Sequence, residues 1–132
     1  VPSIDFNSIN NTSFTIGDLT FLPLDVLHYK LPVKGFRIGK FAYITDVNFI
    51  PEETFEKLHG LEVVVIGALR QKPHISHFSL QQAQNAANRI NAKTTYFIHM
   101  SHDMGLHQSV DSELPSHMHL SYDQLRLNFY SN

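Results

Sequence analysis

Short apolar segments, separated by turn residues, recur along most of the chain and predict β-strands. Gly17-Asp18 and Gly39-Lys40 are pairs of the kind found in tight hairpin turns, so each is expected to join two neighbouring strands. Val63-Val64-Val65-Ile66 is a continuous apolar run, typical of a strand that is buried on both faces. The expected strands are Ser13–Ile16, Leu19–Leu27, Gly35–Ile38, Phe41–Thr45, Leu61–Ala68, Thr94–Ile98, His117–Tyr122 and Leu125–Phe129, with the last two paired.

Two segments carry the signals of helices. Pro51, followed by two acidic residues, is expected to begin a short helix that Gly60 ends. Ser79 is a suitable N-cap for a longer helix, Leu80–Ala92, whose apolar face consists of Leu80, Ala83, Ala86, Ala87 and Ile90. Because strands come first and then alternate with helices, we predict an α/β (α+β) fold in a single unit of residues 1–132. This fold has one mixed sheet with helices on one face.

Composition narrows the class of protein. The 132 residues suffice for one domain with a hydrophobic core, and a formal net charge of -2 provides no basic surface for nucleic acid. Without cysteine, neither a disulfide nor a thiolate metal site can form. No apolar run has the length of a membrane span and the start does not resemble a signal peptide, so a cytoplasmic protein is expected. Histidine occurs nine times and is the commonest metal ligand.

Four polar residues lie where predicted strands end or in the loop that follows: His28, Asp46, His77 and His99. Loops at strand ends often carry ligands and catalytic groups. Imidazoles and a carboxylate suit Zn²⁺, Mn²⁺ or Fe²⁺, and a carboxylate can bridge two ions. Each residue also has an ordinary structural role open to it. A strand-end histidine can hydrogen-bond within the fold, and an aspartate after a threonine can cap a turn.

Five segments, in order along residues 20–128, resemble motifs of metallo-β-lactamase-fold phosphodiesterases. The first has a histidine followed by Gly-aromatic, the second an aromatic-Leu-Thr/Ser-Asp signature, and the third a histidine loop before a long helix. The fourth resembles Thr-His-x-Ser/Gly-His and the fifth a closing Tyr/Phe-Asp-Gly-Leu strand, with Gln124 in place of the glycine. The segments are Val26–Ile38, Phe41–Asp46, Ala68–Leu80, Phe97–His102 and Leu120–Asp123. The subgroup that the chain resembles is the bacterial cyclic-phosphodiesterase relatives of the phosphonate-breakdown pathway, which are related to tRNA 3′-processing endonucleases.

The resemblance implies a role for each matching residue. His28 would bind one of two divalent ions, zinc or manganese, and His99 would bind the other. Asp46 would bridge the two ions. His77 matches a histidine that assists proton transfer or holds the phosphate.

Further matches imply lesser roles. His102 and Asp123 would support the ligands or contact substrate. Four histidines have no role that the resemblance supplies, and they are His74, His107, His117 and His119. His117 and His119 alternate along a predicted strand, so both are expected on one exposed face.

The family's His-x-His-x-Asp-His signature, which carries most of its metal ligands, has no match in this sequence. Each ion would therefore have two protein ligands here, fewer than catalytic zinc sites use, so weak or absent metal binding is expected of the chain alone. The resemblance implies the C-terminal half of an αββα sandwich, with the N-terminal half missing. One sheet face would be bare, which predicts that the chain forms a homo-oligomer or is covered by a second polypeptide.

The function that the resemblance implies is part of a dinuclear metal-dependent hydrolase acting on a small phosphodiester, inactive or weakly active as this chain alone. Two alternatives remain open. The chain could be a non-catalytic association domain that uses its histidines structurally. It could also belong to a metallo-hydrolase that acts on thioesters or lactones, because one fold supports several reactions.

Overall fold

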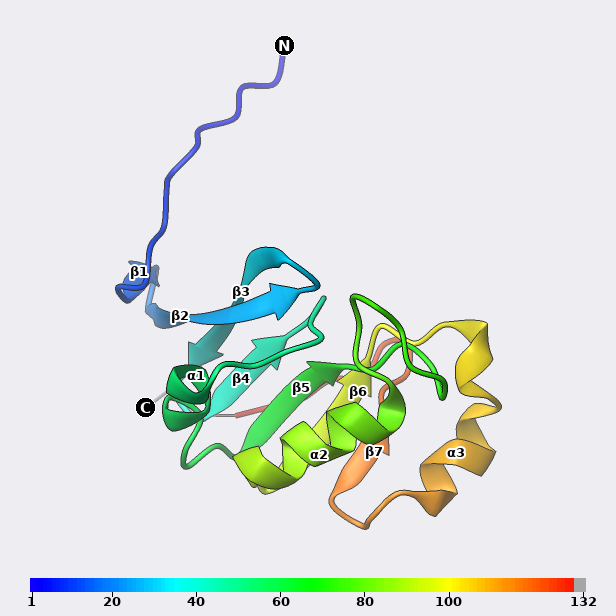
Figure 1. Cartoon of the computed structure of the whole chain (residues 1–132). Coiled ribbons are helices and arrows are strands. Elements are labelled where there is room, and N and C mark those ends of the chain that lie inside the picture. The colour runs from blue at the N-terminus through cyan, green and yellow to red at the C-terminus, as the bar shows by residue number, and fades with distance from the viewer. Residues whose placement is uncertain (130–132) are drawn as a thin grey trace.

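A computed structural model describes residues 1–129 of the chain (Figure 1). Seven strands form one mixed sheet in the order β1-β2-β3-β4-β5-β6-β7. Their bounds are β1 Phe14–Ile16, β2 Leu19–His28, β3 Leu31–Ile38, β4 Phe41–Ile44, β5 Val63–Gly67, β6 Thr94–Ile98 and β7 Met118–Leu120. Residues 1–13 contain no helix or strand, and the N-terminal end of this segment extends away from the sheet. The predicted fold class is confirmed.

Antiparallel hairpins build the first half of the sheet. β1 pairs with β2, β2 with β3, and β3 with β4. Gly17 and Gly39 have positive φ angles of 59° and 57° in two of the turns, a conformation that glycine adopts without a steric penalty. Since β2 and β4 are both antiparallel to β3, they run in the same direction. The carboxyl end of β2 therefore lies at the same edge of the sheet as that of β4.

Parallel pairing builds the second half. β4, β5, β6 and β7 are parallel neighbours, with Val64 of β5 beside Ala42 on one side and Thr95 on the other. The carboxyl ends of these four strands also meet at one edge. Ligand-binding residues collect at such an edge in open α/β sheets, because the strands fix the positions where the following loops begin.

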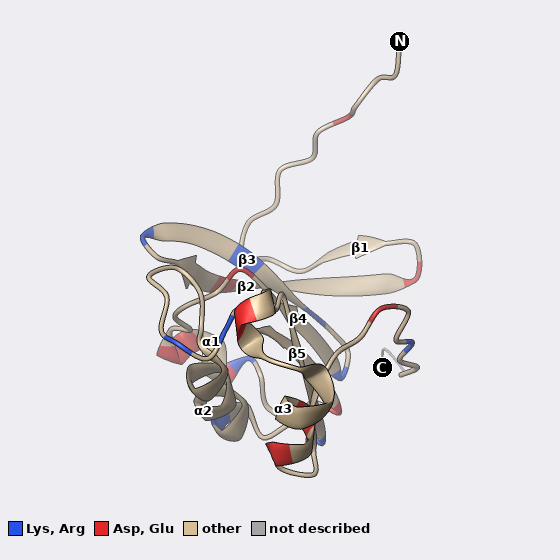
Figure 2. Ribbon diagram, turned by 90° about the vertical axis from the view of Figure 1, so that its right-hand side faces the viewer, with Lys and Arg blue, Asp and Glu red and all other residues tan. Residues whose placement is uncertain are grey.

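Two helices, α1 Glu52–Glu56 and α2 Leu80–Ile90, lie on one side of the sheet, and the last described residues before 130 lie on the other (Figure 2). The Ser79 side chain accepts a hydrogen bond from the Gln82 amide, and the Gln82 side chain accepts one from the Ser79 amide, forming a capping box at the start of α2. The apolar face predicted for α2 is fully buried. It packs in one core with alternate residues of the parallel strands, which include Ala42, Ile44, Val64, Ile66, Phe97 and Leu120.

The segment after β6 contains two helices, although the sequence pattern predicted neither a helix nor a strand between residues 99 and 116. They are the 3-10 helix η1 His102–Met104, which the Ser101 side chain caps, and α3 His107–Glu113. No residue of α3 is buried, so its sequence has no apolar stripe that marks a helix. Across residues 1–129, every helix is too short or too polar to cross a bilayer.

The predicted strand Leu125–Phe129 is wrong. β7 pairs with β6 in parallel, and within residues 1–129 no strand ladder includes residues 125–129. The segment is nevertheless close to the sheet, because the ring of Phe129 stacks on Phe41 with centroids 4.4 Å apart. It covers a cavity of about 520 Å³ on the face of the sheet opposite α2. Tyr43, Val65, Tyr96 and Ile98 line the sheet side of this cavity.

Candidate metal centre

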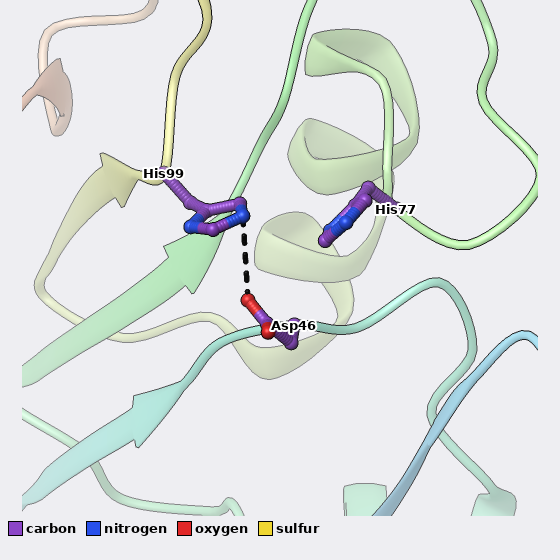
Figure 3. Close-up of side chains that lie close together, drawn as sticks. All are labelled: Asp46, His77 and His99. Atoms are coloured by element: carbon purple, nitrogen blue, oxygen red, sulfur yellow. Dashed lines mark ion pairs between the residues drawn. The ribbon is translucent and has the colours of Figure 1, made fainter. Parts of the chain in front are cut away.

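Asp46 and His99 follow the carboxyl ends of β4 and β6, as the sequence predicted. Both adopt left-handed backbone conformations, with φ angles of 51° and 68°. Positive φ is uncommon outside glycine and tends to persist where surrounding structure enforces it, frequently at functional sites. Oδ1 of Asp46 lies 3.4 Å from Nε2 of His99, and the two side chains point toward one another (Figure 3).

His77 completes a group of three possible ligands. One donor atom each from Asp46, His77 and His99 lies within 4.8 Å of the other two. Two donors bound at about 2.1 Å to one tetrahedral zinc ion are about 3.4 Å apart, which is the separation seen between Asp46 and His99. Oxygen and imidazole nitrogen are also the donor types that zinc and manganese accept. The residues present therefore fit a divalent ion.

His28 joins this group through His77. The Nε2 atoms of His28 and His77 are 3.2 Å apart, and their rings meet edge-on. Two imidazole nitrogens at this distance either share one proton or face the same cation. The ring of His77 also stacks against His99 at 4.9 Å between centroids. His77 is thus the centre of the cluster, in contact with residues from the ends of both β2 and β6.

The pKa of His77 is lowered from its ordinary value of 6.5. Burial is the largest cause, because it disfavours the charged imidazolium. The neighbouring His99 and His28 lower the pKa further, while the carboxylate of Asp46 opposes them. His77 is therefore neutral at neutral pH, the form in which an imidazole can bind a metal or accept a proton.

Backbone hydrogen bonds hold the loop that carries His77, residues 68–79. The Leu69 amide donates to Phe78 and the Leu80 amide to Arg70, so the two ends of the loop pair with one another.

His74 lies in the same loop as His77. The Nδ1 atom of His74 accepts from the Ser76 amide, and the His74 ring lies 5.3 Å from that of His77. Sequence reasoning gave His74 no role, although its spacing of three residues from His77 in one short loop was a signal of shared position.

The other two predicted site residues lie outside the cluster. The side chain of His102 is 94% exposed, and its Nε2 is 3.4 Å from Asp103. Asp123 lines the cavity on the far face of the sheet together with His99. Of these two residues, only Asp123 shares a cavity with a proposed ligand.

The remaining histidines have separate surroundings. The Nε2 of His107 lies within 3.3 Å of the carbonyl oxygens of Leu120 and Ser121, which ties α3 to the end of β7. His119 lies beside Tyr96 and is half-buried, whereas the sequence pattern placed it on an exposed face. His117 is exposed, as predicted.

Comparisons with known proteins agree with this geometry. The chain is similar to a diphosphatase of the PhnP family, whose crystal structure matches 93% of this chain with a TM-score of 0.91 and 35% identity. It is 38% identical over 113 residues, 85% of its length, to an octanoyltransferase from Porphyromonas gingivalis. The metallo-beta-lactamase fold protein YhfI from Bacillus subtilis matches 87% of the chain with a TM-score of 0.72 at 14% identity, which supports the fold alone.

The match to these proteins is partial on their side. The chain spans 48% of the diphosphatase, 52% of the Bacillus protein and 23% of the octanoyltransferase. A family profile, that of the beta-lactamase superfamily domain, matches residues 2–100, about three quarters of the chain. The chain therefore belongs to the family of beta-lactamase superfamily domains.

Proposed function

We propose that this chain is part of a dinuclear metal-dependent hydrolase that cleaves a phosphorus–oxygen bond in a small phosphodiester. The convergence of Asp46, His77 and His99 within 4.8 Å carries the proposal, because it supplies metal donors at the carboxyl edge of a metallo-β-lactamase sheet. The likeness to a PhnP-family diphosphatase, at 35% identity, supports phosphate chemistry. Residues 1–132 would be the C-terminal part of the domain, and activity of this chain alone would be weak or absent.

In the complete site, His28 would hold one divalent ion, His99 the second, and Asp46 would bridge them. Zinc and manganese are the ions that suit these donors. When bound, such ions supply Lewis-acid polarisation of a phosphoryl oxygen and acidify water near neutral pH. The left-handed backbone of Asp46 and His99 fixes where their donor atoms lie before any ion arrives. That pre-set geometry reduces the reorganisation required for binding.

His77 would move a proton during the reaction. Its burial and the neighbouring His99 and His28 lower the pKa of His77, so the imidazole is neutral at rest. It can therefore accept a proton during the reaction, and it releases that proton readily. A histidine with a lowered pKa is a stronger acid once protonated, which favours donation to a leaving oxygen. His102 and Asp123 would contact substrate or support ligands once the rest of the domain is present.

Two observations support the proposal that this chain is one half of a larger domain. The chain spans 48% of the diphosphatase and lacks a His-x-His-x-Asp-His signature, so further ligands would come from sequence outside it. Residues 125–129 cover part of the sheet face opposite α2, and the part that they leave open, where Tyr43 is exposed, would then pack against the second sheet. We propose that this face is covered either by the remaining half of the domain or by a second copy of the chain.

Acyl chemistry is the second candidate, because a 38% identical relative is an octanoyltransferase. That match covers 23% of the relative, so the transferase activity can reside in its other part. A thioester-hydrolysing metal site is compatible with the same ligands, since the fold alone does not select the bond that is cleaved. A non-catalytic association domain is the third possibility. It predicts a stable, metal-free oligomer whose association does not change when a chelator is added.

A substrate panel on the metal-loaded full-length protein separates these functions. The panel contains an aryl phosphodiester, a diphosphate-linked dinucleotide and an octanoyl thioester. We expect turnover of the phosphate substrates, abolished by chelator, and losses of at least about 100-fold in the His28→Ala and Asp46→Ala variants. The His117→Ala variant, altered at an exposed residue outside the cluster, is the control. Full activity in both ligand variants, or turnover of the thioester alone, would contradict the proposal.

A further inference from the structure

The loop after β4, residues 45–51, lies between the end of β2 and the loop that carries His77. On one side, the Asn48 amide donates to Leu27 at 2.8 Å and the Leu27 amide donates to Phe49 at 3.0 Å. On the other side, the Phe78 amide donates to Val47 at 2.8 Å. This short segment therefore acts as a spacer between the two elements that carry His28 and His77.

The Asn48 side chain adds a hydrogen bond on each side. Its Oδ1 accepts from the amide of Tyr29 at 2.6 Å, and its Nδ2 donates to the carbonyl oxygen of Ile75 at 3.3 Å. Tyr29 directly follows His28, and Ile75 lies two residues before His77. The orientation of the amide is fixed, because a backbone amide can only donate and a carbonyl can only accept.

Tyr29 requires this support more than an ordinary strand residue does. Its φ angle is 59°, a left-handed conformation that costs a non-glycine residue about 1 kcal/mol. β2 ends at His28, so the Tyr29 amide lies beyond the last residue of the strand. The hydrogen bond from this amide to Asn48 stabilises the turn that immediately follows His28.

We propose that Asn48 is a positioning residue that fixes the separation of His28 and His77, at present 3.2 Å between their Nε2 atoms. The role of that pair in metal binding and proton transfer rests on the proposed function. No other side chain that the structure describes donates to one of these two loops and accepts from the other. Asparagine suits the position because one short, planar group contains both the acceptor and the donor.

Three variants of the metal-loaded full-length protein test this role. Asn48→Ala removes both side-chain bonds. Asn48→Gln keeps the amide but moves it outward by one methylene, and it carries the same test if the alanine variant does not fold. Asn88→Ala is the matched control, since Asn88 is an exposed asparagine on α2 with no partner in either loop. The readouts are kcat, KM, the absorption bands of the cobalt-substituted protein, and the melting temperature.

We expect Asn48→Ala to lower kcat about 10- to 100-fold with KM changed less, as loss of groups that orient metal ligands does. The cobalt bands of Asn48→Ala should shift. Asn48→Gln should lower kcat and shift the bands by as much as Asn48→Ala or by less, and Asn88→Ala should match the parent in both. A lower melting temperature with unchanged kcat and cobalt bands would show a purely structural role and overturn the proposal. If the parent has no phosphodiesterase activity, the proposed function fails, while the cobalt bands still decide whether Asn48 positions the histidines.

Discussion

Oδ1 of Asp46 lies 3.4 Å from Nε2 of His99, although the two residues follow strands β4 and β6, which β5 separates. Each residue leaves its strand in a left-handed conformation, and the two side chains meet between the strand ends. Residues at the ends of two adjacent strands would lie side by side with ordinary backbone conformations. Here the contact extends across an intervening strand, so it depends on the unusual backbone at both ends.

We predict that this chain alone binds one divalent ion rather than two. In the complete site proposed above, His77 would move a proton, but in the chain alone Asp46, His77 and His99 offer three donors within 4.8 Å. Three protein ligands with one open position is the arrangement of catalytic zinc sites. Titration with cobalt, followed by its visible absorption, should saturate at one ion per chain. The affinity should be lower than that of the complete site proposed above, in which further ligands would join these three.

Variants of the same residues check the assignment. Asp46→Asn and His99→Ala should each weaken cobalt binding at least about 10-fold, because each removes one of three donors. His117→Ala should bind as the parent does. Saturation at two ions, or unchanged binding by both ligand variants, would contradict a three-donor site.

Backbone strain at His99 gives a second prediction. His99→Gly and His99→Ala remove the same imidazole, but only glycine adopts a φ of 68° without a steric penalty. We expect the glycine variant to be the more stable of the two by about 1 kcal/mol in free energy of unfolding. Urea denaturation of the metal-free chain measures the difference. Equal stability, or a more stable alanine variant, would mean that the backbone at His99 is not strained.

The positions of the cluster residues could be predicted from the sequence to a large extent. Asp46 and His99 end apolar runs that form strands, and His77 lies in a loop between a strand and a capped helix. The pattern did not show that His77 lies between His28 and His99, because that depends on the direction of β2 and on the path of the loop. The role of Asn48 was also hidden, since a single asparagine in a loop carries no periodic signal.

The falsely predicted strand Leu125–Phe129 and the missed helix α3 both arise because apolar periodicity was the signal used to predict backbone structure. Leu125, Leu127 and Phe129 alternate with polar residues as a strand does, and they do face the cavity beside the sheet. A strand also requires a backbone partner, and the alternation says nothing about whether one is present. Conversely, α3 has no buried residue, so packing imposes no apolar period on it.

The pH dependence of His77 follows from the causes of its lowered pKa. In the metal-free chain, we expect its NMR titration to have a midpoint below the ordinary value of 6.5. His28→Ala should raise this pKa, because it removes a positive neighbour and some of the burial. Asp46→Asn should lower the pKa further, because it removes the one neighbouring charge that favours imidazolium. Shifts of the opposite sign would show that these residues do not surround His77 in solution.

The same shift makes stability depend on pH. The folded pKa lies below the unfolded one, so the unfolded state binds a proton more readily. The contribution of His77 to stability is therefore complete above pH 6.5 and is lost as the pH falls through the lowered folded value. Urea denaturation should show less loss between neutral and mildly acidic pH in His77→Phe than in the parent, since phenylalanine does not titrate. An equal loss in both proteins would assign the acid sensitivity to other groups.

The apolar sheet face gives the last prediction. Phe41, Tyr43 and Tyr96 line a cavity of about 520 Å³ opposite α2, and Tyr43 remains on the surface with 38% of the residue exposed. Exposed apolar area of this kind drives association, so we expect this chain alone to form a dimer or larger oligomer at micromolar concentrations. Tyr43→Lys should shift it toward monomer in sedimentation velocity experiments, because association would bury the new charge. Leu106→Lys is the matched control, since Leu106 is 78% exposed and lies outside this cavity. A parent chain that stays monomeric, or equal effects of the two lysines, would show that this face does not mediate self-association.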